Sequence, residues 1–143
     1  MSTWNDLLEH YLQKAGKHED KNNIENFAIV GYQSGLSGEM WAHSNLNLDF
    51  QCRKNLRALL KNPDDAKTDG ILIGERRFVY VDGDENMIVG KEKSEDKCPL
   101  IIIQTKNTVV VAIGRKSENS KVVDYLVQEI ANELADYLTA SGF

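Results

Sequence analysis

Two runs, PLIIIQ at 99–104 and TVVVAIG at 108–114, are the most apolar part of this chain, and only TKN at 105–107 separates them. Both runs are rich in β-branched residues and are too short for buried helices, so they predict neighbouring strands. A three-residue connection is typical of a hairpin. The fold is therefore expected to be built around this antiparallel pair.

The same pattern continues toward the N-terminus. GILIG (70–74), RFVYV (77–81) and NMIVGKE (86–92) are strand-like, and the turn DGDE (82–85) joins the last two. Closely spaced strands with short turns predict an antiparallel meander. A further hairpin is expected earlier in the chain, formed by NFAIVGYQ and GEMWAHS around SGLSG at 34–38.

Helical patterns occur at three places. Residues 3–15 carry apolar side chains at helical spacing, and a short helix is expected over 48–62, capped by Asn47 or Asp49 and ended by Asn62 and Pro63. From about residue 120 an apolar residue recurs every fourth position, which predicts a helix of about five turns. GKHEDKNNIEN (16–26) is polar and is expected to be a solvated loop.

This order predicts an α+β fold in a single domain, residues 1–143: a central antiparallel sheet with helices at both ends of the chain. The first and last helices each carry an apolar stripe that has to be buried on the sheet. They can meet this requirement side by side on one face.

Composition excludes several functions. The net charge of −5 speaks against nucleic acid as a partner, because phosphate binding needs a basic surface. DGDEN (82–86) fails as a calcium loop, and the sequence has no HExxH, GxSxG or phosphate-loop motif. We therefore expect no metal, no cofactor and no enzymatic activity.

The sequence also bears on location. No signal peptide or membrane-spanning segment is expected. Cys52 and Cys98 are far apart in sequence; free thiols in a reducing cytoplasm are the favoured interpretation, and a single disulfide is the alternative.

Four aromatic residues stand out by position: Trp4, Trp41, Tyr137 and Phe143. Taken singly, each fits a role in core packing. If the terminal helices pack side by side over the sheet, however, all four can converge on one patch. An exposed aromatic patch is a typical docking surface for a polyproline II helix.

The chain resembles the profilin family over nearly its whole length. The resemblance rests on TWNDLLEHYL, AIVGYQSG followed by EMWAHS, GILIGERRFVYVDGDENMIVGKEK, IIIQTKNTVVVAIGRK and LADYLTASGF. It implies a profilin-like fold, with the N- and C-terminal helices on one face of the sheet and short helices on the other. It also implies a cytoplasmic, cytoskeletal protein, expected to be a monomer, that binds monomeric actin and proline-rich proteins on separate faces and regulates actin polymerisation.

Site residues follow from this resemblance position by position. The implied polyproline site is Trp4, Leu7, Trp41, Tyr137, Leu138 and Phe143, where Leu7 replaces the Tyr of many profilins and predicts weaker binding. The implied actin site is Arg77, Lys91, Lys93, Gln128 and Glu133. Phosphoinositide binding is known in the family and is expected to be weak in an acidic chain. From the residues alone, the cations are equally well explained as charges that protect a strand edge from aggregation.

Two other classes of protein fit the same order of elements. An adaptor of the longin or roadblock kind would share the architecture without needing aromatic residues at both termini. A small-ligand sensor of the PAS kind would need a pocket within the sheet. Exposure of Trp4 and Trp41 distinguishes the first from a profilin, and a solid core argues against the second.

Overall fold

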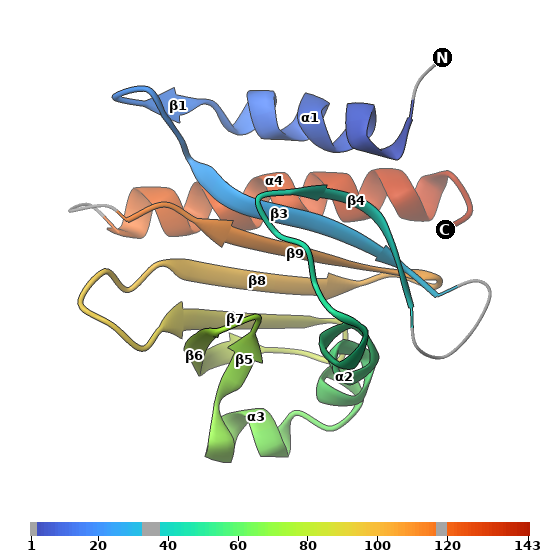
Figure 1. Cartoon of the computed structure of the whole chain (residues 1–143), viewed down its shortest axis with the longest axis vertical. Helices are drawn as coiled ribbons and strands as arrows, with labels where there is room; N and C mark the ends of the chain where they lie inside the picture. The colour runs from blue at the N-terminus through green and yellow to red at the C-terminus, as the bar shows by residue number, and fades with distance from the viewer. Residues whose placement is uncertain (1–2, 33–37, 117–119) are drawn as a thin grey trace.

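A computed structural model describes residues 3–32, 38–116 and 120–143. Seven antiparallel strands form one sheet in the order β4-β3-β9-β8-β7-β6-β5 (Figure 1). Its strands are β3 (Ile24–Gly31), β4 (Glu39–Ser44), β5 (Ile71–Ile73), β6 (Arg76–Gly83), β7 (Met87–Glu92), β8 (Pro99–Gln104) and β9 (Thr108–Gly114). The helices are α1 (Trp4–Ala15), α2 (Phe50–Lys61), α3 (Asp64–Asp69) and α4 (Ser120–Ala140).

The predicted central hairpin is present as β8 and β9, paired from Leu100 opposite Ile113 to Gln104 opposite Val109. Every residue of β9 is buried, as is every residue of β8 except Gln104. A strand buried on both faces must be covered by a layer on each side. This requirement accounts for the positions of the helices.

Successive residues of β9 belong to different cores. Val110 and Ala112 lie in the cluster beneath α1 and α4, whereas Val109, Val111 and Ile113 lie in the cluster beneath α2 and α3. The alternation follows from the two-residue period of a strand. Both faces of the sheet are thus packed, as the α+β prediction required, and the predicted placement of the terminal helices together on one face is confirmed.

The two terminal helices contact each other and lie alongside one another, and the two ends of the chain are at the same end of the molecule (Figure 1). α4 packs on β8 and β9, and α1 packs on β3 and β4. Thr3 begins α1 with a capping box, in which its side chain accepts from the Asp6 N–H and the Asp6 carboxylate accepts from the Thr3 N–H, each at 3.1 Å. Such a cap stabilises a first turn that would otherwise fray.

Two details of the sequence prediction are wrong. The segment expected as a loop at 16–26 contains a small ribbon of β1 (Lys17–His18) and β2 (Lys21–Asn22), and β3 already begins at Ile24. Glu19 and Asp20 make the turn of this ribbon with φ of 52° and 65°. The ribbon could not be predicted from the sequence, because two-residue polar strands have no hydrophobic periodicity.

Helix α3 was also not predicted. It is only six residues long, and its single buried residue is Ala66. Asp64 and Asp65 lie in its first turn, where they stabilise the positive end of the helix dipole. Gly70 follows with φ of 83°, a conformation that glycine adopts without strain. The predicted turn at 34–38 lies outside the described residues except for Gly38.

One ion pair ties three strands together on the α2 side of the sheet. Arg76 of β6 binds both carboxylate oxygens of Glu92 on β7 at 2.8 Å and donates to Oδ1 of Asn26 on β3, also at 2.8 Å. The pair is partly buried, with side-chain exposures of 29% for Arg76 and 15% for Glu92. The hydrogen bonds from Arg76 hold the pKa of Glu92 below its ordinary value.

We predict that Glu92→Gln lowers the free energy of unfolding by about 2 kcal/mol near neutral pH, because a charge-assisted bidentate contact is lost. A carboxylate whose pKa is lowered by folding stabilises the protein above its unfolded pKa and loses this effect as the pH falls through the folded value. The difference between the wild type and Glu92→Gln should therefore shrink in acid. Urea unfolding at a series of pH values measures it.

Glu95→Gln is the matched control, because Glu95 is exposed in the loop between β7 and β8. It should leave stability unchanged over the same pH range. If Glu92→Gln is as stable as the control at neutral pH, the ion pair does not stabilise the fold.

Candidate functional site

Three aromatic rings from distant parts of the chain form one cluster. Trp4 stacks on Trp41 with ring centroids 4.6 Å apart and an interplanar angle of 26°. The ring of Phe143 meets both edge-on, at 5.1 Å from Trp4 and 5.4 Å from Trp41. All three side chains are half-buried, so the cluster packs against the core below and presents ring surface above.

The two tryptophans are placed by the contact between α1 and β4. Trp4 is the first residue of α1, and Asn5 beside it accepts the backbone N–H of His43 on β4 through Oδ1 at 3.2 Å. Gly31 on β3 lies directly under the indole of Trp41: a Cβ at that position would come within 1.8 Å of Cε2. Glycine is therefore required for Trp41 to lie flat on the sheet.

Phe143 is held by backbone hydrogen bonds. Its N–H donates to the carbonyl of Leu138 at 2.8 Å, which folds the last residues back against α4. Its carbonyl accepts from the N–H of Asn107 at 2.5 Å and from Oγ1 of Thr105 at 3.0 Å, both in the turn between β8 and β9. The central hairpin of the sheet thus fixes the third ring of the cluster.

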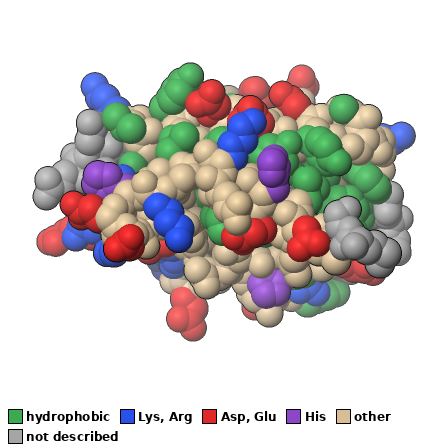
Figure 2. All heavy atoms as spheres, turned by 90° about the horizontal axis from the view of Figure 1, so that it is seen from above, with side chains coloured by type: hydrophobic (Ala, Val, Ile, Leu, Met, Phe, Trp, Pro, Cys, Tyr) green, Lys and Arg blue, Asp and Glu red, His purple; other side chains and the backbone are tan. Residues whose placement is uncertain are grey.

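A groove of about 440 Å³ opens beside these rings, between α1 and the end of α4. It is lined by Thr3, Trp4, Asp6, Leu7, His10, Tyr137, Ser141 and Phe143. We call it the aromatic groove. Seen from the α1 side, hydrophobic side chains gather toward one end of this face, with acidic side chains around them (Figure 2).

The sequence-based residues separate into three roles here. Trp4, Leu7, Tyr137 and Phe143 line the groove, and Tyr137 is 48% exposed. Trp41 supports the rings from below through its stack with Trp4. Leu138 is fully buried in the core, so it supports the wall without reaching the surface.

Sequence reasoning missed the polar part of the lining, namely Thr3, Asp6, His10 and Ser141. The available signal was helical spacing, because His10 lies one turn after both Asp6 and Leu7 on the same side of α1. Polar residues on an exposed helix face usually carry no function, so this spacing did not single them out.

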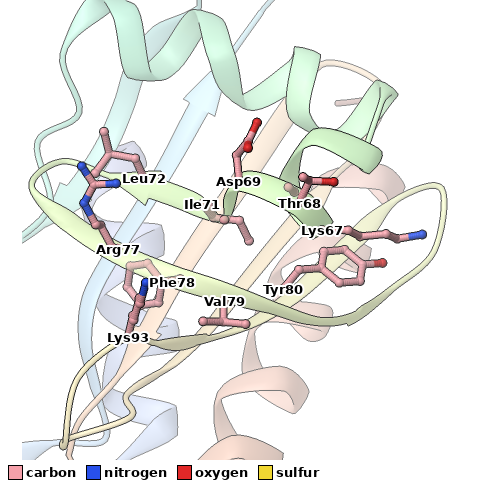
Figure 3. A pocket seen from close by; sticks show the side chains of 12 residues that line it. Lys67, Thr68, Asp69, Ile71, Leu72, Arg77, Phe78, Val79, Tyr80 and Lys93 are labelled. Carbon is pink, nitrogen blue, oxygen red and sulfur yellow. The ribbon is translucent and has the colours of Figure 1, made fainter.

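The sequence-predicted actin residues lie elsewhere, on β6, on β7 and directly after it, and on α4. Arg77 and Lys93 are exposed, and the Lys93 N–H donates to the carbonyl of Arg77 at 2.8 Å. With Lys67 they line a hollow of about 370 Å³ between α3, β5 and β6, in which apolar side chains such as Leu72 and Val79 also lie (Figure 3). This hollow combines positive charge with exposed apolar surface.

Lys91 is not a free charge, because it forms an ion pair with Asp124 of α4. Its partner across the strands is Val79, so Lys91 and Val79 share one face of the sheet. Gln128 lies on the same side of α4, with its amide 4.0 Å from the sulfur of Met87 on β7. Lys91 and Gln128 therefore line the boundary between α4 and β7.

Glu133 is separated from this group. Its carboxylate is 2.9 Å from the ammonium of Lys14, so it faces α1 and not β7. Gln128 and Glu133 are five positions apart on one helix, which turns their side chains to different sides of it.

Several exposed apolar residues were missed by sequence reasoning: Leu72, Val79 and Val81 on β5 and β6, and Val122 and Tyr125 on α4. Tyr125 is 70% exposed although it lies on a helix with an extensive buried stripe. Exposed large apolar side chains beside charges are typical of protein-binding surfaces. We call Arg77, Lys91 and Lys93, with Leu72, Val79 and Val81, the strand face.

Other site chemistry is not found in the part of the chain that the structure describes. No group of three or more His, Cys, Asp or Glu side chains there could hold a metal ion, and no helix there is long and apolar enough to cross a membrane. Cys52 and Cys98 are free, so the alternative of a disulfide is not formed. Burial raises the pKa of the Cys98 thiol to about 11, which keeps it protonated and unreactive.

Comparison with known proteins agrees with this architecture. The sequence pattern of the Profilin family matches residues 2–143. Profilin-1 of Dictyostelium discoideum is 28% identical over 142 residues, which cover 99% of each chain. Acanthamoeba castellanii profilin IA has the same fold, with a TM-score of 0.76 and 21% identity over 99% of this chain and all of the other.

Two further structures of the same fold contain a second molecule. One is mouse profilin IIa in complex with a double repeat from the FH1 domain of mDia1, with a TM-score of 0.68 and 19% identity over 94% of this chain and 98% of the other. The other is a complex of LokiProfilin1 with rabbit actin, with a TM-score of 0.59 and 20% identity over 90% of this chain and 94% of the other.

The chain belongs to the profilin family. Profilins are non-enzymatic actin-binding proteins of the cytoskeleton, which agrees with the prediction of a protein without a catalytic centre. The family assignment decides against the longin, roadblock and PAS alternatives. The packed cores on both faces of the sheet also argue against a sensor with an internal pocket.

We predict that Gly31→Ala displaces the indole of Trp41, because the added Cβ overlaps the ring. Overpacking of this kind costs about 1–3 kcal/mol in stability. The stacking of the two tryptophans should be lost as well, which near-ultraviolet circular dichroism detects.

A double-mutant cycle with Trp41→Ala provides the control. Without the indole, Gly31→Ala should cost little, so the two changes should be strongly coupled in urea unfolding. An equal cost of Gly31→Ala in both backgrounds would show that the close approach of Gly31 to Trp41 does not position the ring.

Proposed function

We propose that this protein binds monomeric actin through the strand face and proline-rich segments through the aromatic groove, and thereby regulates actin polymerisation in the cytoplasm. The cluster of Trp4, Trp41 and Phe143 is the observation that carries the proposal for proline. A polyproline II helix is already rigid and offers flat rings, so it stacks on aromatic side chains at low entropic cost.

The groove also offers hydrogen-bond donors beside the rings. Tyr137, Ser141 and His10 carry polar hydrogens and line the same opening. The carbonyl groups of a polyproline II helix have no internal partners and point outward. Donors placed next to apolar rings therefore suit this ligand. Leu7 supplies apolar contact only, which supports modest affinity.

The strand face supports the proposal for actin. It combines exposed Leu72, Val79 and Val81 with the cations Arg77 and Lys93, and it lies on the far side of α4 from α1. A protein interface needs an apolar centre with polar residues at its rim. The complex of LokiProfilin1 with rabbit actin is a precedent on the same fold. Separate surfaces would let one monomeric protein hold both ligands.

We predict that Trp41→Ala weakens binding of a peptide of proline alone by about 30-fold, because Trp4 loses the ring on which it stacks and an aromatic hot spot contributes about 2 kcal/mol. Isothermal titration calorimetry measures this without relying on tryptophan fluorescence. Tyr125→Ala is the matched control, because it removes an aromatic ring that is 70% exposed on α4 outside the groove lining. Equal affinity of both variants for the peptide would contradict the assignment of the groove.

For actin, we predict that Arg77→Glu combined with Lys93→Glu slows association, since charges at an interface act mainly through electrostatic steering. The wild type should slow spontaneous nucleation of pyrene-labelled actin, and the double variant should require a higher concentration to do so. Lys91 is left intact in this test because its charge is paired with Asp124.

The control is Lys54→Glu combined with Lys61→Glu, which reverses two exposed charges of α2 on the opposite face of the sheet. This variant should act like the wild type. If the wild type has no effect on nucleation at a large excess, the actin assignment is wrong. If both double variants match the wild type, the contact surface lies elsewhere.

A further inference from the structure

The aromatic groove lies in an acidic part of the surface. Of the described residues that line it, Asp6 is an acid and none is Lys or Arg. Helix α1 and the last turns of α4 form its two walls. Together they carry the carboxylates Asp6, Glu9, Glu133 and Asp136, against the single ammonium of Lys14. The groove is therefore bordered by an excess of negative charge.

The one lysine on these walls does not neutralise the acids nearest the rings. Lys14 is ion-paired with Glu133 at 2.9 Å. Within residues 3–32, 38–116 and 120–143, no ion pair involves Asp6, Glu9 or Asp136. Asp136 is exposed and directly precedes Tyr137, one of the groove's walls. These acids are thus free to meet a charge on a ligand.

Asp6 is held in a fixed position within the lining. Its Oδ2 accepts the backbone N–H of Thr3 at 3.1 Å as part of the capping box. A carboxylate accepts several hydrogen bonds, so this contact leaves capacity for a cationic donor. Because the cap restrains the side chain, a ligand cation would not have to order it on binding, which reduces the entropic cost of an ion pair.

Prolines carry no charge, so the acids contribute nothing to binding a run of prolines alone. They act on the residues beside the run, which lie within a Debye length of the groove. We infer that the aromatic groove selects proline-rich segments that carry Lys or Arg next to the prolines and discriminates against segments flanked by Asp or Glu. This inference rests on the proposed binding of proline-rich ligands and names the chemistry of the partner.

Three peptides test this selectivity: one of proline alone, one with Arg on both sides of the prolines, and one with Glu on both sides. Titration of tryptophan fluorescence gives their affinities. At low ionic strength the Arg-flanked peptide should bind about fivefold more tightly than the uncharged peptide, and the Glu-flanked peptide more weakly, as expected for a few exposed ion pairs. High salt should bring the three affinities together.

Variants then locate the effect on the protein. Glu9→Gln combined with Asp136→Asn should remove most of the preference for Arg and leave affinity for the uncharged peptide unchanged. Glu75→Gln combined with Glu95→Gln removes the same charge from exposed positions near β6 and β7, and it should retain the preference. Asp6 is kept in both variants so that the cap of α1 stays intact.

The outcomes separate this inference from the proposed function. Binding of the uncharged peptide with equal affinity for the Arg- and Glu-flanked peptides at low salt would overturn the charge selectivity and leave the aromatic groove assignment standing. If both double variants lose the preference for the Arg-flanked peptide, the net charge of the protein causes the preference and the acids beside the groove do not. This result would also overturn the inference. No binding of any peptide would instead contradict the proposed function itself.

Discussion

Burial of β8 and β9 on both faces is the constraint on which the rest of the structure depends. Adjacent residues of β9 enter two different cores, so neither face of the sheet can be left to solvent. The amphipathic α1 and α4 cover one face, and α2 and α3 cover the other. Covering one face with the first and last helices brings Trp4 and Phe143 together, although they are separated by almost the whole chain.

The aromatic groove is thus a consequence of how the core is covered. Trp41 lies on Gly31 of the neighbouring strand, Trp4 lies on Trp41, and Phe143 closes the cluster from the turn after α4. The rings are partly core and partly surface. A rigid floor of this kind needs little reordering when a ligand binds, which favours affinity. The same rings tie both ends of the chain to the sheet, so stability and the proposed binding of proline-rich ligands rest on shared contacts.

Charge is distributed unevenly between the two candidate surfaces. The strand face carries the cations Arg77 and Lys93, although the chain as a whole has a net charge of −5. Beside the groove, Asp6 and Glu9 of α1 and Asp136 of α4 form no ion pair within the described residues. In the proposed function, this difference in local charge would help one small domain to attract two chemically different partners.

Much of the secondary structure could be predicted from the pattern of apolar residues, because strands and helices depend on local periodicity. Alternating and continuous apolar runs indicated the strands around 99–114, and a four-residue recurrence indicated α4. The convergence of Trp4, Trp41, Tyr137 and Phe143 followed from placing the two helices on one face. By contrast, the ribbon at β1 and β2 and the short α3 bury too little to leave a periodic signal.

The sequence by itself therefore determined the class of fold, the order of its main elements and the aromatic residues of the groove. Only the tertiary structure decided which side chains are available to a partner. Lys91 is paired with Asp124 and Glu133 with Lys14, while Leu138 is buried and Asp6 is exposed beside the rings. The physical reason is that hydrophobic periodicity is local in the chain, whereas ion pairs and surface exposure depend on elements that meet only after folding.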